Sequence, residues 1–318
     1  MEVISMPMWA WILFYALVIV MLYADLKLFG RKGQHEVSIS EALKMTAVWI
    51  IVSLIFCGGI WFYEGIDKAE EFLAGYLIEK SLSMDNLFVF LMLFSFFGVQ
   101  RKYQHEVLFW GIFGALVLRS VFIFAGAAMV QRFEWILGVF GVFLIYTGIK
   151  MFSHKDDESV DPSKNIFVKL FKKYFPVTDQ MHEDKFFIIE NGKRLATPLF
   201  IALLVIETTD VAFAVDSIPA VFSVSRDPFI VLTSNIFAIL GLRALYFALA
   251  AIAKYFAYLK YGLGIILSFV GVKMLLEVLP APLHYEVRTP ISLLIIFGVL
   301  VLSMLASYVA TLYSRKRQ

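Results

Sequence analysis

Nine stretches of largely apolar residues dominate this 318-residue chain, each long enough to cross a membrane as a helix. A membrane-spanning helix needs about 20 consecutive, mostly apolar residues. The chain is 60% hydrophobic and 17% charged, far from the roughly 45–50% and 25% of soluble domains. The sequence therefore predicts an all-α polytopic membrane protein that forms a single transmembrane domain over residues 1–318. The nine expected spans are 7–26, 43–63, 71–97, 105–130, 133–152, 195–222, 229–252, 255–279 and 289–313.

Basic residues between the spans gather on one side of the expected membrane, most densely between Lys150 and Arg194. Because cytoplasmic loops are enriched in Lys and Arg, we expect the N-terminus outside and the C-terminus in the cytoplasm. The net charge of +2 reflects this asymmetry, so we expect membrane lipid and no nucleic acid as a partner. The other side carries only four basic residues, which are Lys68, Arg132, Arg226 and Arg288.

One connecting segment, residues 153–194, is long enough to fold beside the membrane and is expected in the cytoplasm. Residues 166–174 place apolar side chains on one helical face and lysines on the other, which predicts an amphipathic helix on the membrane surface. Asn191-Gly192 predicts a hairpin turn. We interpret the segment as a solvated lid. The alternative is a metal sensor built from His154, Asp156, Asp157, Glu158 and His182.

Carboxylates inside the apolar spans are the most informative polar residues. The segment ETTDVAFAVDSIPAV, residues 207–221, carries Glu207, Asp210 and Asp216. An ionisable side chain at bilayer depth costs at least about 2.5 kcal/mol, so such groups usually face an interior and mark an ion path. Pro219 removes a backbone hydrogen bond, and we therefore expect the helix to kink or open beside Asp216.

The third, fourth and fifth spans match the sixth, seventh and eighth in order. EKSLSMDN in the third span and DVAFAVDS in the sixth each carry two acids six residues apart. Arg119 and Arg243 lie near the middle of the fourth and seventh spans, each after two leucines. GVFLIYTGIKM and GIILSFVGVKM, residues 141–151 and 264–274, match at five positions. The matched polar residues of the third and sixth spans are Glu79 with Asp210, Asp85 with Asp216, and Asn86 with Ser217.

These matches predict a 3+3 inverted repeat, with repeat one at 71–152 and repeat two at 195–279. Three spans are an odd number, so the second copy must cross the membrane in the opposite sense. Such repeats build secondary transporters, which bind substrate near the midplane at the repeat interface. Spans one, two and nine would then be peripheral additions.

Helix geometry indicates which acids can share one ion. At about 100° per residue, two acids six positions apart diverge by roughly 120°, so the site must lie between helices. The repeat axis would bring Asp85 opposite Asp216 and Asn86 opposite Ser217. Their oxygen donors suit Mg²⁺, Ca²⁺ or Mn²⁺, whereas zinc and copper would favour His or Cys.

Charge counting also favours a cation. We expect Glu79, Glu207 and Asp210 to surround the metal, and Arg119, Arg243 and Lys80 to act as counter-charges. The simplest role of Lys80 is an ion-pair partner of Glu79. With Lys273 as a fourth deep cation, the five acids exceed the cations by about one charge, which a divalent ion would overturn.

The motifs GYLIEKSLSMDNLFVF, ETTDVAFAVDSIPAV and DPFIVLTSNIFAILGLRALYF resemble those of the TerC family, and the whole chain is similar to its bacterial Alx-like branch. The resemblance implies a multi-pass protein of the bacterial inner membrane, linked to manganese export and, by name, to tellurite resistance. By position it implies a metal site at Asp85, Asn86, Asp216 and Ser217.

Three functional readings follow. The first is a secondary transporter, not an enzyme, that exports Mn²⁺ as substrate and holds no cofactor, with proton entry through Glu79, Glu207 or Asp210. The second is a membrane redox modulator or stress-response factor, for which the chain offers one cysteine, Cys57. The third makes Arg119 and Arg243 an oxyanion site for tellurite, against which the excess of carboxylates argues. The sequence leaves open whether the protein forms a homo-oligomer.

Overall fold

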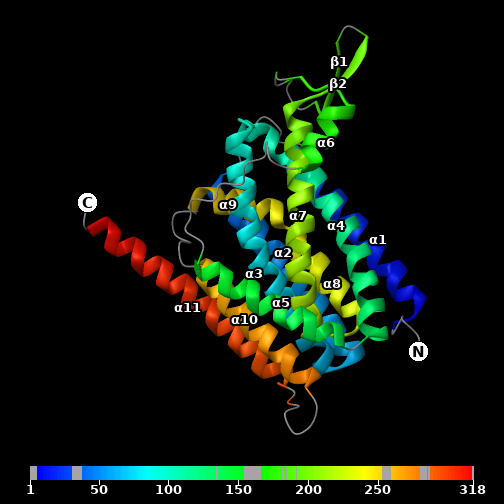
Figure 1. The fold of residues 1–318 in the computed structure, drawn as a ribbon, viewed down its shortest axis with the longest axis vertical. Helices are drawn as coiled ribbons and strands as arrows, with labels where there is room; N and C mark the ends of the chain where they lie inside the picture. The colour runs from blue at the N-terminus through cyan, green and yellow to red at the C-terminus, as the bar shows by residue number, and fades with distance from the viewer. Residues whose placement is uncertain are drawn as a thin grey trace.

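The computed structural model describes residues 6–30, 38–133, 135–153, 166–178, 180, 182, 185–190, 192–252, 259–279, 285 and 287–316. Within them the chain is a bundle of helices with one small hairpin (Figure 1). The elements are α1 Met8–Gly30, α2 Ile39–Glu64, α3 Ile66–Phe96, α4 Arg101–Arg132, α5 Trp135–Ser153, α6 Ile166–Tyr174, β1 Phe187–Glu190, β2 Lys193–Ala196, α7 Pro198–Phe222, α8 Pro228–Ile239, α9 Leu242–Ile252, α10 Leu259–Val278 and α11 Thr289–Lys316.

The expected fold class, an all-α polytopic membrane protein, is confirmed. Eight stretches of the described residues are helical, long and apolar enough to cross a membrane. The ninth expected span, 71–97, falls on the 31-residue helix α3, which is less apolar because it carries several charged side chains. The count of nine spans therefore stays a prediction.

The interruption in helical structure lies in the seventh expected span and not at Pro219. Helix α7 runs unbroken through Pro219 to Phe222, so the expected opening beside Asp216 is not seen. Pro219 falls in the last turn of α7, and its missing N–H leaves the carbonyl oxygen of Val215 without its usual helical donor. The chain instead breaks at Leu240-Gly241, between α8 and α9, where Gly241 takes a φ of 84°. That left-handed conformation favours glycine.

Helix α2 is more than a peripheral addition, because it packs on α3, α8 and α9. Trp49 of α2 lies against the break in the seventh span. A Cβ at Gly241 would come within 2.6 Å of the Trp49 ring, so glycine is also the residue that leaves room for the indole.

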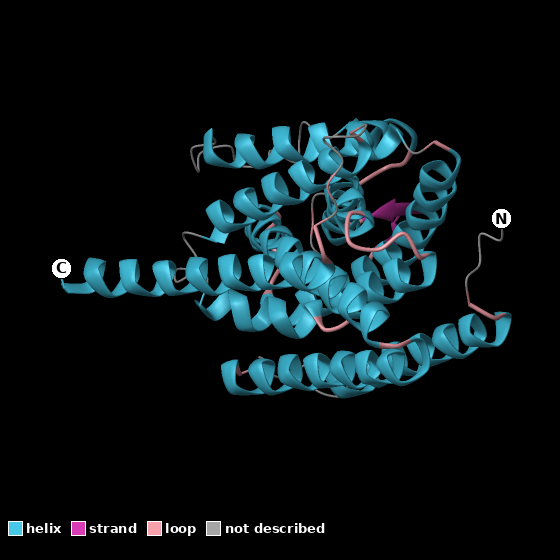
Figure 2. Cartoon of the chain, turned by 90° about the horizontal axis from the view of Figure 1, so that it is seen from below, coloured by secondary structure: helices cyan, strands magenta, loops and turns pink. Residues whose placement is uncertain are grey.

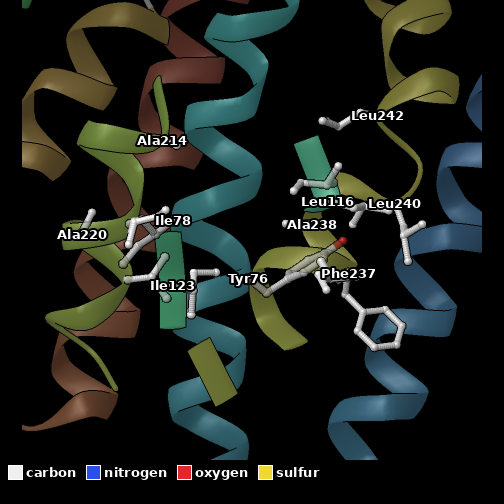
Figure 3. Packing of buried hydrophobic residues seen from close by; sticks show 14 of the residues in the cluster. Tyr76, Ile78, Leu116, Ile123, Ala214, Ala220, Phe237, Ala238, Leu240 and Leu242 are labelled. Atoms are coloured by element: carbon white, nitrogen blue, oxygen red, sulfur yellow. The ribbon is translucent and has the colours of Figure 1, made fainter. Parts of the chain in front are cut away.

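Buried apolar side chains from several helices form one core (Figure 3). Ile78 of α3, Leu116 of α4, Ala214 of α7 and Phe237 of α8 all belong to it. In contrast, α1, α2 and α11 leave most of their apolar side chains exposed, which are surfaces that lipid would cover. Figure 2 shows the C-terminal part of α11 projecting beyond the other helices.

The segment before α7 holds the helix α6 and the antiparallel hairpin β1–β2. Val168 is buried and Phe171 packs on Phe200 of α7, whereas Leu170 and Tyr174 are exposed. Figure 1 shows the hairpin beyond α6, at the end where α7 begins. Four of the five expected sensor residues, His154, Asp156, Asp157 and Glu158, lie outside the described residues, and the fifth, His182, is half-buried before the hairpin.

Helices α5 and α10 form the closest helix pair of the two expected repeats. A Cβ at Gly141 would lie 2.8 Å from the carbonyl oxygen of Gly271, and one at Gly148 would lie 2.6 Å from that of Gly264. The contacts run antiparallel, and small residues permit such close backbone approach. In the repeat alignment Gly141 corresponds to Gly264 and Gly148 to Gly271, so each contact is the exchanged copy of the other. A two-fold axis produces this reciprocity.

The other helix contacts follow the same exchange. In the two expected repeats α3 corresponds to α7, α4 corresponds to α8 and α9, and α5 corresponds to α10. Accordingly, α3 packs on α8 as α7 packs on α4, and α5 packs on α7 as α10 packs on α3. This is the pattern that the inverted repeat predicts, although the repeat itself stays a prediction.

Candidate functional site

The centre of the candidate site is Arg119, whose side chain is fully buried in the middle of α4. Its guanidinium donates to both oxygens of Asp210, at 3.1 Å from Nε to Oδ2 and 2.8 Å from Nη2 to Oδ1. Nη1 donates to Oε1 of Glu79 and, at 3.4 Å, to Oγ of Ser217. Arg119 thus joins Glu79 and Asp210, the two acids that occupy equivalent positions in the expected repeats.

Glu79 of α3 is fully buried and has further partners. Asn235 of α8 donates from Nδ2 to Glu79 Oε2 at 2.9 Å, and Ser83 Oγ lies 3.4 Å from Oε1. Both Glu79 oxygens are therefore satisfied. Since one guanidinium faces two carboxylates, this buried cluster carries one net negative charge when Glu79 and Asp210 are ionised.

Glu207 lies one turn before Asp210 on α7 and points at α4. Its Oε2 atom is buried, and no hydrogen-bond partner for it is found among the described residues. A side chain at Gly114 of α4 would collide with the Glu207 carboxylate. Gly114 therefore provides the space for this carboxylate, a role that the sequence analysis missed.

Asp216 faces a different neighbour from Asp210, as the divergence of about 120° along the helix predicts. Thr147 of α5 lies 3.4 Å from Asp216, measured from Oγ1 to Oδ1. Ser217 and Asn86 are buried. Asp85 lies within α3, but its side chain is outside the described part of the chain, so the pairing of Asp85 with Asp216 stays a prediction.

Lys80 does not pair with Glu79, and that expectation was wrong. Its Nζ donates at 3.1 Å to the carbonyl oxygen of Ala238, and its ammonium lies 6.0 Å from the centre of the Tyr76 ring. The carbonyl of Ala238 lacks a helical donor because α8 ends at Ile239. A cation is favoured there by the negative end of the helix dipole.

Arg243, the repeat equivalent of Arg119, is a counter-charge for an acid that the sequence analysis did not consider. Its Nη1 lies 3.1 Å from Oδ2 of Asp25 in α1, and both side chains are buried. Asp25 lies at the end of the first apolar stretch, and this position of an acid was the sequence signal that could have identified it as a partner for a buried cation. Arg243 also lies over the Phe109 ring at 5.9 Å.

The described part of the chain therefore separates the candidate acids into two kinds. Glu79 and Asp210 share the single cation Arg119, whereas no ion pair to a described side chain holds Glu207 or Asp216. Among the described residues, no group of three His, Cys, Asp or Glu side chains is placed to hold a metal. The negative charge available to a cation thus comes from Glu207, from Asp216 and from the one charge that Arg119 leaves uncompensated on Glu79 and Asp210.

Comparison with known proteins agrees with the membrane fold. The profile of the integral membrane protein TerC family matches residues 64–317. An uncharacterized membrane protein of Myxococcus xanthus is 48% identical over 300 residues, covering 94% of this chain and 92% of its own. A Salmonella typhi protein with the provisional name membrane-bound redox modulator Alx is 46% identical over 312 residues, covering 96% and 95%. No solved structure matches the chain.

Proposed function

The chain belongs to the TerC family of integral membrane proteins, and from this premise we propose that it is a secondary transporter that exports Mn²⁺ from the cytoplasm across the bacterial inner membrane. Asp85 and Asp216 bind the ion jointly near the midplane, with Asn86 and Ser217 as neighbouring donors. Glu79, Glu207 and Asp210 surround the site, and proton entry drives the exchange.

The observation that carries this proposal is a set of carboxylates between membrane helices, Glu79 and Asp210 buried and Glu207 and Asp216 half-buried, beside Arg119. Arg119 offsets one of the two charges on Glu79 and Asp210, and no described ion pair holds Glu207 or Asp216. Unpaired acids at bilayer depth are costly and mark ion pathways. Carboxylate, amide and hydroxyl oxygens are the donors that a hard divalent cation such as Mn²⁺ prefers.

Manganese transport into proteoliposomes tests the proposal. Asp85→Asn and Asp216→Asn each remove a ligand and a negative charge, so each should reduce Mn²⁺ transport at least tenfold while the protein still folds. Because both acids act on one ion, the double variant should be no worse than either single variant.

Asp67→Asn is the matched control, because Asp67 lies exposed at the start of the same helix as Asp85. It should transport as the unmodified protein does. Wild-type Mn²⁺ transport by either Asp85→Asn or Asp216→Asn would rule out the joint site, and no transport by the unmodified protein would rule out the function.

The provisional name of the Salmonella typhi relative favours a second candidate, a redox modulator or stress-response factor. Cys57 is the chain's single cysteine, and its Sγ lies 3.5 Å from the carbonyl oxygen of Ala69. Thiol chemistry within the chain would pass through Cys57, so Cys57→Ser should abolish a redox phenotype and leave Mn²⁺ transport unchanged.

A further inference from the structure

A cluster of charged side chains connects the two expected repeats at the end where α7 finishes. We call it the end cluster, and it lines a pocket of about 550 Å³. Lys68 of α3 binds Glu71 at 2.9 Å and lies 4.0 Å from Asp227, just before α8. Ser225 donates to the same Glu71 at 2.6 Å. The α7–α8 turn is thereby tied to a helix of the other repeat.

Lys273 of α10 closes the same end from a second direction. Its Nζ donates at 2.7 Å to the carbonyl oxygen of Ser223, the first residue after α7, and lies 3.7 Å from Glu277. Arg226 lies 3.7 Å from the same Glu277. The Lys273 side chain is only 4% exposed and is one of the residues that line the pocket.

The repeat equivalent of Lys273 is Lys150 of α5, and its environment is different. Both lysines lie five to six residues from the centre of the α5–α10 contact, which places each roughly 8 Å away on opposite sides of it. Lys150 is exposed, its charge lies near enough to the Asp216 carboxylate for the two to attract, and no hydrogen bond joins it to a described residue. The two equivalent lysines thus differ, because Lys273 holds the carbonyl oxygen of a turn and Lys150 holds none among the described residues.

We propose that Lys273 and Lys150 are alternating gate residues and that the structure has the α7–α8 end closed. This inference rests on the proposed function, since a transporter must expose its site to each side in turn. When Lys273 releases Ser223, the end cluster separates. The turn between α3 and α4, residues 97–100, is the counterpart in repeat one of the turn between α7 and α8. Lys150 then engages this turn and closes the other end.

Cysteine labelling tests the gate without measuring transport. In a Cys57→Ser background, Ala220→Cys places a thiol one turn before Ser223, at a position that is fully buried. A membrane-impermeant maleimide applied to right-side-out and inside-out vesicles should label it slowly. Lys273→Met should raise the labelling rate about tenfold from the α7–α8 side, whereas Lys273→Arg should keep it low.

Lys150→Met is the matched control, because it removes the equivalent lysine and should not raise labelling of Ala220→Cys. The mirrored probe Val89→Cys, at the position equivalent to 220, should reverse the pattern, with Lys150→Met raising its labelling. Arg226→Gln gives a second test if Lys273→Met fails to fold, since the Arg226 side chain is half exposed. It should raise labelling of Ala220→Cys about threefold.

The outcomes separate the two proposals. The gate would be overturned if labelling of Ala220→Cys is unchanged in a folded Lys273→Met variant, even if Mn²⁺ transport is normal. If only Arg226→Gln folds, unchanged labelling in that variant would overturn the gate in the same way. The reversed labelling pattern without Mn²⁺ transport would support the gate and exclude manganese as its substrate.

Discussion

At the scale of single residues, the two arginines at equivalent repeat positions have different partners. Arg119 binds Glu79 and Asp210, one acid from each expected repeat, while Arg243 binds Asp25 from outside both repeats. The equivalence of the sequence positions therefore does not extend to the ion pairs. Helix α1 contributes the acid that makes the difference.

Arg119→Ala should cost more stability than any exposed substitution on the same helix. It leaves Glu79 and Asp210 buried without their cation, and breaking a buried ion pair typically costs about 3–5 kcal/mol. The yield of monodisperse protein and the melting temperature in detergent measure this loss. Arg132→Ala is the control, because Arg132 is exposed at the end of α4, and it should melt as the unmodified protein does.

A well-folded Arg119→Ala variant that no longer transports would contradict this structural role. Arg119 would then belong to the substrate path, which would favour an oxyanion substrate.

The sequence was sufficient to find the buried acids but not their partners. Charged side chains in apolar stretches stand out because their burial costs so much, so Glu79, Asp210 and Arg119 were all identified. Lys80 was assigned to its neighbour in sequence, Glu79. Its actual acceptor at Ala238 is available only because α8 ends at Ile239, and a long-range break of this kind leaves no local charge pattern.

At the scale of helices, the α5–α10 pair depends on four glycines. Gly148 and Gly264 approach so closely that a Cβ on either would lie 2.6–2.9 Å from the other's carbonyl oxygen. Gly141 and Gly271 repeat the arrangement. The sequence matched these glycines in the repeat alignment, but it could not show that they face one another.

Gly148→Val and Gly264→Val should each force α5 and α10 apart. Overpacking of this kind typically costs about 1–3 kcal/mol, so both variants should melt several degrees lower in detergent. Gly298→Val on α11 is the control, since a Cβ there meets no atom within 4 Å, and its melting temperature should stay unchanged. Equal melting of all three variants would show that the close approach is not needed.

The helix break shows where element prediction from sequence fails. Residues 229–252 form a continuous apolar stretch, and one glycine inside it is no strong sign of an interruption. The break lies against Trp49 of α2, a residue far away in the sequence that fills the space beside Gly241. Pro219, the stronger local signal, instead lies inside the unbroken helix α7.

At the scale of the whole molecule, the direction of the proposed transport depends on which end faces the cytoplasm. Figure 1 places the hairpin β1–β2 at the end where α7 begins, and the end cluster lies where α7 finishes. The charge asymmetry predicts that the hairpin end is cytoplasmic. The closed end in the proposed gate would then be the outer one.

Reporter fusions test this orientation. Fusions within 154–165 and after residue 316 should report the cytoplasm, and fusions within 280–286 should report the outside. The reverse pattern would make the closed end cytoplasmic and turn the proposed export into uptake.

The ion pair between Asp25 and Arg243 also bears on how the chain is assembled in the membrane. Ribosomes make α1 first, and about 220 residues separate its acid from the arginine of α9 that neutralises it. At roughly 5–20 residues per second, Asp25 waits on the order of 10 to 40 s for that partner. During this interval the first helix must keep its carboxylate near the lipid headgroups or in the insertion machinery. The final position of α1 is therefore set only after most of the chain has been inserted.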